Sequence, residues 1–175
     1  MKILLCGYMG AGKSYWLNKM PGNYSQRFDL DQQIEAMYGP IGQIFAHEGE
    51  ATFRRYESEV LLDVLSRPGP WLIALGGGAL NLELRERLRS AGHGLIWLDT
   101  PLACCLERIK GSDRPKSAMT FEQHQSLYNL RVPLYRMADW TVQGPENAQI
   151  ESDQHLFKKM MIIMNGRIDE ALRHS

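Results

Sequence analysis

The sequence has no excess of either charge, few cysteines and no long apolar run. It contains 20 lysines and arginines and 20 aspartates and glutamates, so no net charge attracts it to nucleic acid or to a membrane surface. Its three cysteines are odd in number, and Cys104 and Cys105 are adjacent, which excludes a disulfide framework and a C-x-x-C metal pair. No apolar run approaches the roughly 18 residues of a transmembrane helix, and the chain begins with a buried-type strand rather than the pattern of a secretion signal. We therefore expect a cytoplasmic protein that binds neither nucleic acid nor membranes.

The chain also lacks internal repeats, low-complexity linkers and any shared spacing among its histidines. At 175 residues it is long enough for one substantial core and too short for two ordinary domains. We expect a single domain over residues 1–175. No exposed apolar stripe is evident, which favours a monomer, and no histidine is assigned to metal binding or catalysis.

What the sequence does contain, at residues 7–14, is a match to the G-x-x-x-x-G-K-[ST] phosphate loop at every fixed position: GYMGAGKS. An apolar run precedes the loop, and a helix is expected to follow it. The three glycines allow positive φ and close backbone approach, so successive N–H groups can surround an anion. Lys13 is expected to contact the β- and γ-phosphates of a nucleotide, and the Ser14 hydroxyl to ligate a bridging Mg²⁺.

The rest of the chain alternates short apolar runs with helical patterns. Buried-type strands are expected at residues 2–6, 27–31, 71–75, 94–98 and 140–142. Helices are expected at residues 13–20, 32–38, 41–48, 50–67, 81–91, 101–109, 120–137 and 151–173, with Asn81 and Thr100 as caps. Residues 110–117 follow no periodicity and indicate a mobile surface loop. The alternation predicts a three-layer α/β fold around a five-stranded parallel sheet, with the first strand central and ligands at the carboxyl ends of the strands.

Two acids, Asp29 and Asp31, alternate about a single residue at the end of the second predicted strand. On an extended stretch they would point the same way into one cleft. One could then hold magnesium through water while the other accepts a proton from a substrate hydroxyl. Equally, both could be caps of the following helix. A calcium loop beginning at Asp29 is excluded, because its sixth position is Ile34 and its twelfth is Pro40.

Several further motifs follow in a fixed order. They are Asp29-x-Asp31, GQIF at 42–45, GEATFRRYE at 49–57, Gly76-Gly77-Gly78, Arg114-Pro115 and RVPLYRMAD at 131–139. Together with the phosphate loop they resemble the shikimate kinase family, from the first strand to about residue 139. The resemblance implies a P-loop kinase fold with a lid at about 110–118 and a helical substrate-binding region at about 31–60. It implies transfer of the γ-phosphate of ATP to the 3-hydroxyl of shikimate, with Mg²⁺, on the route to chorismate and the aromatic amino acids.

The resemblance also implies a role for each matching residue. The implied acceptor-site residues are Asp31, Phe45, Phe53, Arg54, Glu57, Gly76, Gly77, Gly78 and Arg131. Among them Asp31 would be the general base, while Arg54 and Arg131 would bind the shikimate carboxylate. Glu57 would orient the two arginines. The glycines would let the backbone approach the ring, and the two phenylalanines would pack on its apolar face.

On the nucleotide side, the implied binding residues are Gly10, Ala11, Gly12, Lys13, Ser14, Tyr15, Arg108 and Arg114. Lys13 and Arg114 would act with Asp31 in catalysis, with Arg114 on the lid stabilising the charge that develops in transfer. Arg108 would lie along the adenine. Mg²⁺ would be held by Ser14 and, through water, by Asp29.

Plainer interpretations remain open for several of these residues. Phe45 and Phe53 could be ordinary core, Arg54 could lie on a solvated helix face, and Arg131 could sit at a helix surface. The three glycines could be only a strand exit.

The chain also departs from the family pattern in places. Tyr15 stands where a small hydroxyl residue is usual, and the stretch from Arg108 to Arg114 is a residue short. Lys116 and Ser117 follow Pro115, where the family commonly has two leucines. Lys116 could add a phosphate contact, although an exposed lysine is usually solvated.

Two rival functions fit the same phosphate loop. One is a related small-molecule kinase with another acceptor, such as gluconate. The other is a catalytically weak regulatory binding module that has kept the fold. The two arginines and the triple glycine favour shikimate, because both features belong to the acceptor pocket.

Overall fold

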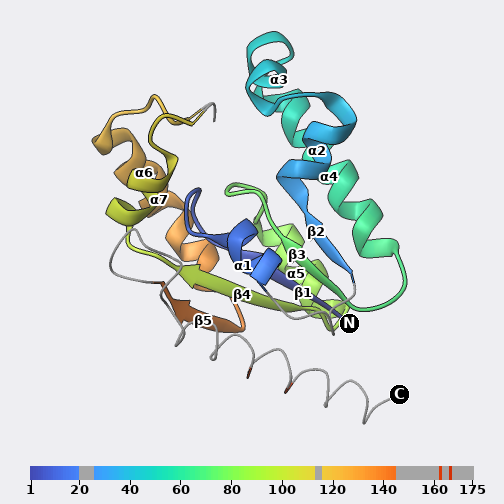
Figure 1. The fold of residues 1–175 in the computed structure, drawn as a ribbon. Coiled ribbons are helices and arrows are strands. Elements are labelled where there is room, and N and C mark those ends of the chain that lie inside the picture. The colour runs from blue at the N-terminus through green and yellow to red at the C-terminus, as the bar shows by residue number, and fades with distance from the viewer. Residues whose placement is uncertain (20–25, 113–115, 145–161, 163–165, 167–175) are drawn as a thin grey trace.

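A computed structural model describes residues 1–19, 26–112, 116–144, 162 and 166 of the chain. Within these residues, five strands form one sheet: β1 (Lys2–Cys6), β2 (Arg27–Asp29), β3 (Trp71–Ala74), β4 (Gly94–Asp99) and β5 (Trp140–Gln143). Their order is β2-β3-β1-β4-β5 and every pair is parallel, as Figure 1 shows. All five residues of β1 are buried, as expected of a central strand covered on both faces. The predicted parallel α/β fold is confirmed.

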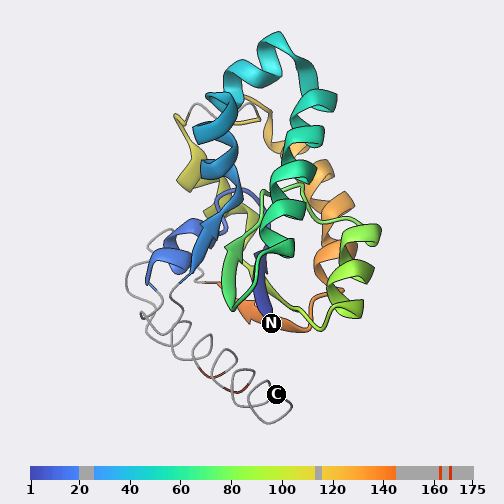
Figure 2. The ribbon, with the colours of Figure 1, turned by 90° about the vertical axis from the view of Figure 1, so that its right-hand side faces the viewer.

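The helices of the described residues lie between the strands in sequence. They are α1 (Lys13–Lys19), α2 (Leu30–Tyr38), α3 (Ile41–His47), α4 (Gly49–Ser66), α5 (Leu82–Ser90), α6 (Leu102–Ile109) and α7 (Phe121–Tyr135). Figure 2 shows α1 on one face of the sheet and α5 and α7 on the other. The lobe formed by α2, α3 and the start of α4 lies beyond the carboxyl end of β2, as Figure 1 shows. Among the described residues, no helix is both long and apolar enough to span a bilayer.

The second strand is shorter than predicted, and Asp31 is helical. β2 ends at Asp29, and α2 begins at Leu30. The reason is that the Asp29 carboxylate accepts the N–H of Gln32 at 3.2 Å and caps the helix, while the Asp29 backbone remains extended. The two acids therefore do not alternate along one strand. For Asp29 the cap was the right interpretation, and Asp31 lies in the first turn of α2.

Of the two predicted helix caps, Asn81 is confirmed and Thr100 is wrong. Asn81 caps α5 by accepting the N–H of Leu84 at 2.8 Å, as predicted. Thr100 does not cap α6, because its hydroxyl donates instead to the carbonyl of Ala11 at 3.0 Å. That bond ties the end of β4 to the phosphate loop. The predicted helix at 151–173 falls outside the described residues, apart from two isolated positions.

Candidate active site

The phosphate loop joins β1 to α1 and has the backbone that its glycines predict. Gly10 and Gly12 have φ values of 79° and 98°, a region that other residues rarely adopt. The Lys13 ammonium donates to the carbonyls of Gly7 and Tyr8, each at 2.9 Å, and Lys13 is buried. These bonds hold the lysine across the loop that is predicted to surround the phosphates.

Helix α6 packs directly on this loop. A Cβ added to Gly10 would collide with the backbone carbonyl of Cys105, so no larger residue fits there. Arg108 donates from Nη1 to the carbonyl of Gly10 at 3.1 Å, and burial lowers the pKa of its guanidinium. Arg108, which was predicted to lie along adenine, is therefore held at the phosphate loop.

Two cavities meet at the carboxyl ends of β1, β2 and β3. The smaller, of about 170 Å³, is lined by Gly10, Gly12, Lys13, Ser14, Tyr15, Asp29, Asp31, Leu75 and Arg108. The larger, of about 370 Å³, is lined by Met9, Ser14, Asp29, Asp31, Gln32, Glu35, Ile41, Phe45, Phe53, Arg54, Glu57, Gly77, Gly78, Lys116 and Arg131. Ser14, Asp29 and Asp31 line both cavities. A donor in the smaller cavity and an acceptor in the larger would thus meet beside these three side chains.

Asp29 and Ser14 offer the oxygen atoms that Mg²⁺ prefers. One carboxylate oxygen of Asp29 caps α2, whereas Oδ2 is buried and has no hydrogen-bond partner among the described residues. No group of three or more His, Cys, Asp or Glu side chains suited to a metal occurs in the described part of the chain. This donor set suits an ion that keeps water and phosphate ligands, which is usual for Mg²⁺ beside a nucleotide.

Arg54 and Arg131 come from different helices and converge on Gly78. A Cβ added to Gly78 would lie 2.7 Å from Nη2 of Arg131 and 2.8 Å from Nη2 of Arg54. The absence of a side chain at Gly78 therefore allows the two guanidiniums to approach each other. Arg131 also lies over the ring of Tyr8, with 5.6 Å between Cζ and the ring centroid. Its Nη1 is buried without a hydrogen-bond partner among the described residues.

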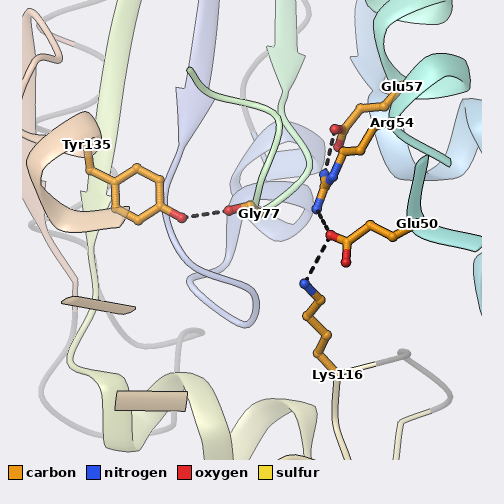
Figure 3. A network of polar contacts seen from close by, with 6 residues as sticks. All are labelled: Glu50, Arg54, Glu57, Gly77, Lys116 and Tyr135. Atoms are coloured by element: carbon orange, nitrogen blue, oxygen red, sulfur yellow. Dashed lines mark hydrogen bonds and ion pairs between the residues drawn. The ribbon is translucent and has the colours of Figure 1, made fainter. Parts of the chain in front are cut away.

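Glu57 fixes the position of the Arg54 guanidinium. Its Oε2 accepts from Nη1 of Arg54 at 2.6 Å, and the carboxylate is buried, as Figure 3 shows for this pair. Burial raises the pKa of Glu57, and the negative charge of Asp31 adds to that rise while the two arginines oppose it. Burial alone would lower the pKa of Arg54, but Glu57 and Glu50 outweigh it and raise the pKa. The site thus keeps Arg54 charged and fixed in direction.

The remaining predicted acceptor residues also reach the larger cavity or its wall. Phe45 and Phe53 line it with their ring centroids 4.8 Å apart, so they pack on each other and face the cavity. A Cβ at Gly76 would meet Oε1 of Glu57 at 2.5 Å and Oδ1 of Asp31 at 2.8 Å. Gly76 therefore leaves room for the carboxylates of Glu57 and Asp31 beside the end of β3.

Tyr135 was given no role by the sequence analysis. The Tyr135 hydroxyl donates to the carbonyl of Gly77 at 2.7 Å and fixes the glycine-rich exit of β3, as Figure 3 shows. Its position within the RVPLYRMAD motif was the available signal. For Lys116 the sequence left open a phosphate contact or a solvated side chain, and the structure places it in an ion pair with Glu50 at 3.2 Å. Arg114 and Pro115 lie outside the described residues.

The chain is similar in sequence and in fold to known proteins. Residues 9–161 match the family model described as shikimate kinase. A shikimate kinase of Mesorhizobium japonicum is 38% identical over 147 residues, covering 80% of this chain and 71% of the relative. One from Aromatoleum aromaticum is 38% identical over 152 residues, covering 82% and 85%. The solved structure of shikimate kinase from Acinetobacter baumannii in complex with shikimate has a TM-score of 0.79 at 30% identity, covering 95% of this chain and 93% of that one. On the strength of these matches, the chain belongs to the shikimate kinase family.

Proposed function

We propose that this chain transfers the γ-phosphate of ATP to the 3-hydroxyl of shikimate, with Asp31 as the general base. The observation that carries the proposal is the position of Asp31, which lines both the cavity beside the phosphate loop and the cavity that holds two arginines. ATP in the first cavity would present its γ-phosphate beside this carboxylate. Shikimate in the second would bring its hydroxyl to the same place.

The acceptor's carboxylate binds Arg54 and Arg131 in this proposal. Guanidinium groups form paired hydrogen bonds with a carboxylate, and two of them converge at Gly78. Phe45 and Phe53 supply an apolar wall for the ring. Binding the carboxylate at one end of the cavity then leaves the hydroxyls at the other end, toward Asp31.

Transfer requires positioning and charge stabilisation rather than covalent chemistry by the protein. The acceptor oxygen forms a bond to the γ-phosphorus, the bond to the β-phosphate oxygen breaks, and Asp31 takes the hydroxyl proton. Lys13 stabilises negative charge on the β- and γ-phosphates. Ser14 and Asp29 would hold Mg²⁺, which neutralises phosphate charge when bound. The catalytic and nucleotide-binding roles of Arg114 and the contacts of Ala11 and Tyr15 with the nucleotide stay predictions from the family pattern.

The test is phosphoryl transfer with Mg·ATP, with shikimate and gluconate offered in parallel and ADP release followed against a control without acceptor. Release that depends on shikimate alone is expected, since gluconate lacks the ring that the two phenylalanines would contact. Gluconate-dependent release would show that the acceptor pocket is misassigned. Shikimate binding without transfer, measured by titration calorimetry, would favour a regulatory binding module.

We also propose that the protein acts as a cytoplasmic monomer. Its cysteines Cys6, Cys104 and Cys105 are buried free thiols, which suits a reducing compartment. The exposed large apolar side chains of the described residues are distributed over several helices, including α2, α4, α5 and α7. Light scattering after size-exclusion chromatography should give the mass of one chain, 20.0 kDa, and twice that mass would refute the monomer.

A further inference from the structure

Four charged side chains form a continuous row beside the acceptor cavity, and three of them, Lys116, Arg54 and Glu57, line it. The Lys116 ammonium lies 3.2 Å from Oε1 of Glu50, and the same oxygen lies 3.0 Å from Nη2 of Arg54. Arg54 in turn bonds Glu57 through Nη1 at 2.6 Å. Figure 3 shows the row with Lys116 at one end and Glu57 at the other, so positive and negative charges alternate.

This row places Arg54 between two carboxylates. Glu57 is buried and bonds one guanidinium nitrogen, whereas Glu50 is half exposed and bonds the nitrogen that also faces Gly78. A carboxylate arriving at Arg54 would therefore meet Glu50, a like charge, at the same nitrogen. A cation that offsets the charge of Glu50 would therefore favour acceptor binding.

Lys116 is placed to do this. Its side chain is only 24% exposed, lines the acceptor cavity and forms an ion pair with Glu50. Burial tends to raise the pKa of Glu50, but the hydrogen bonds from Arg54 and Lys116 outweigh it and lower the pKa, so Glu50 stays ionised.

We infer that Lys116 is a positioning residue that sets the affinity for a carboxylate-bearing acceptor, by offsetting the charge of Glu50 beside Arg54. The inference rests on the proposed function, because it takes Arg54 as the group that binds the carboxylate. Lys116 acts through Glu50 and Arg54 and takes no part in the chemical step. Its removal should therefore change the KM for the acceptor and leave kcat and the KM for ATP nearly unchanged.

The experiment measures kcat and both KM values for five variants. Lys116→Leu should raise the KM for shikimate about threefold, in the range that one partly exposed ion pair supports. Lys116→Arg keeps the charge and should restore the wild-type value. Glu50→Gln should lower the KM, because the competing anion is gone, and adding Lys116→Leu to it should cause no further change. Arg89→Leu, at an exposed position of α5, is the control for loss of a positive charge.

Each contrary outcome has a distinct meaning. An unchanged KM for shikimate in Lys116→Leu would overturn the inference, while normal wild-type turnover would leave the proposed function intact. An equal rise with and without Glu50→Gln would also overturn it, since Lys116 would then act independently of Glu50. If the wild type failed to phosphorylate shikimate, the proposed function would fail. Titration of shikimate binding to the same variants would then decide the inference separately.

Discussion

Replacing Gly78 by alanine is expected to weaken shikimate binding without unfolding the protein. The added Cβ would lie 2.7 Å from Nη2 of Arg131, and 2.8 Å and 3.1 Å from Nη2 and Nη1 of Arg54, closer than side chains normally approach. These atoms are the ends of flexible side chains, and Gly78 does not have a positive φ. The guanidiniums can therefore move, and the backbone can remain as it is.

The substitution weakens binding because it displaces the two guanidinium groups that bind the carboxylate. A hydrogen bond to a charged group contributes about 1.5–3 kcal/mol, and a small displacement weakens such bonds at both arginines rather than removing them. Arg54 cannot simply follow the acceptor, because Glu57 holds it at 2.6 Å. We expect a total loss of about 1.5–3 kcal/mol, which corresponds to about a tenfold to a hundredfold rise in the KM for shikimate.

The assay is steady-state ADP release over a range of shikimate concentrations at saturating ATP, repeated over a range of ATP. The KM for ATP should stay within about twofold of the wild type, because Gly78 lines the larger cavity and not the smaller one. Gly166→Ala is the matched control, since a Cβ there meets nothing within 4 Å. A folded Gly78→Ala variant with an unchanged KM for shikimate would refute the convergence of both arginines on the acceptor.

Three further predictions concern the reaction and the stability of the fold. Asp31→Asn should lower kcat by about a hundredfold or more while ATP titration stays unchanged, and retained activity would remove Asp31 as the base. Tyr8→Phe removes the hydroxyl that lies 2.9 Å from Nδ1 of buried His124. It should lower the free energy of unfolding, measured in urea, by about 1–3 kcal/mol. An unchanged midpoint of urea unfolding would contradict this. Burial lowers the pKa of His93 from 6.5 to about 4, with Lys2 adding to the shift, so the folded state keeps this ring neutral. Its contribution is complete above pH 6.5 and is lost as the pH falls toward about 4, by about 1–2 kcal/mol after discounting for its partial exposure; His93→Gln should flatten this part of the pH profile of urea unfolding.

The sequence patterns predicted the type of each described element but not where β2 ends. The interval from Arg27 to Asp31 has alternation that suits a strand, yet the Asp29 carboxylate stops it by capping α2. A short polar side chain can serve an extended strand or a helix cap, and local sequence does not separate the two. Asp31 was nevertheless predicted in the cleft, and it lines both cavities from a helical turn rather than from a strand.

Lys116 makes a contact that local sequence cannot reveal. Its partner Glu50 is 66 positions away, and the lysine follows a stretch with no periodicity. An isolated lysine in a loop is usually solvated, whereas this side chain is only 24% exposed and pairs with Glu50. Tyr135 is a similar case, because its bond to the carbonyl of Gly77 spans 58 positions.

The sequence by itself determined the phosphate loop, the alternation of strands and helices and the parallel sheet. These features depend on local causes. The φ values open to glycine and the position of Lys13 determine the phosphate loop, and the spacing of apolar residues determines the strands and helices. Only the tertiary structure decided that Arg54 and Arg131 meet at Gly78, and that Lys116 pairs with Glu50. Such contacts join different elements, so they depend on how helices pack against the sheet and each other, which no local pattern encodes.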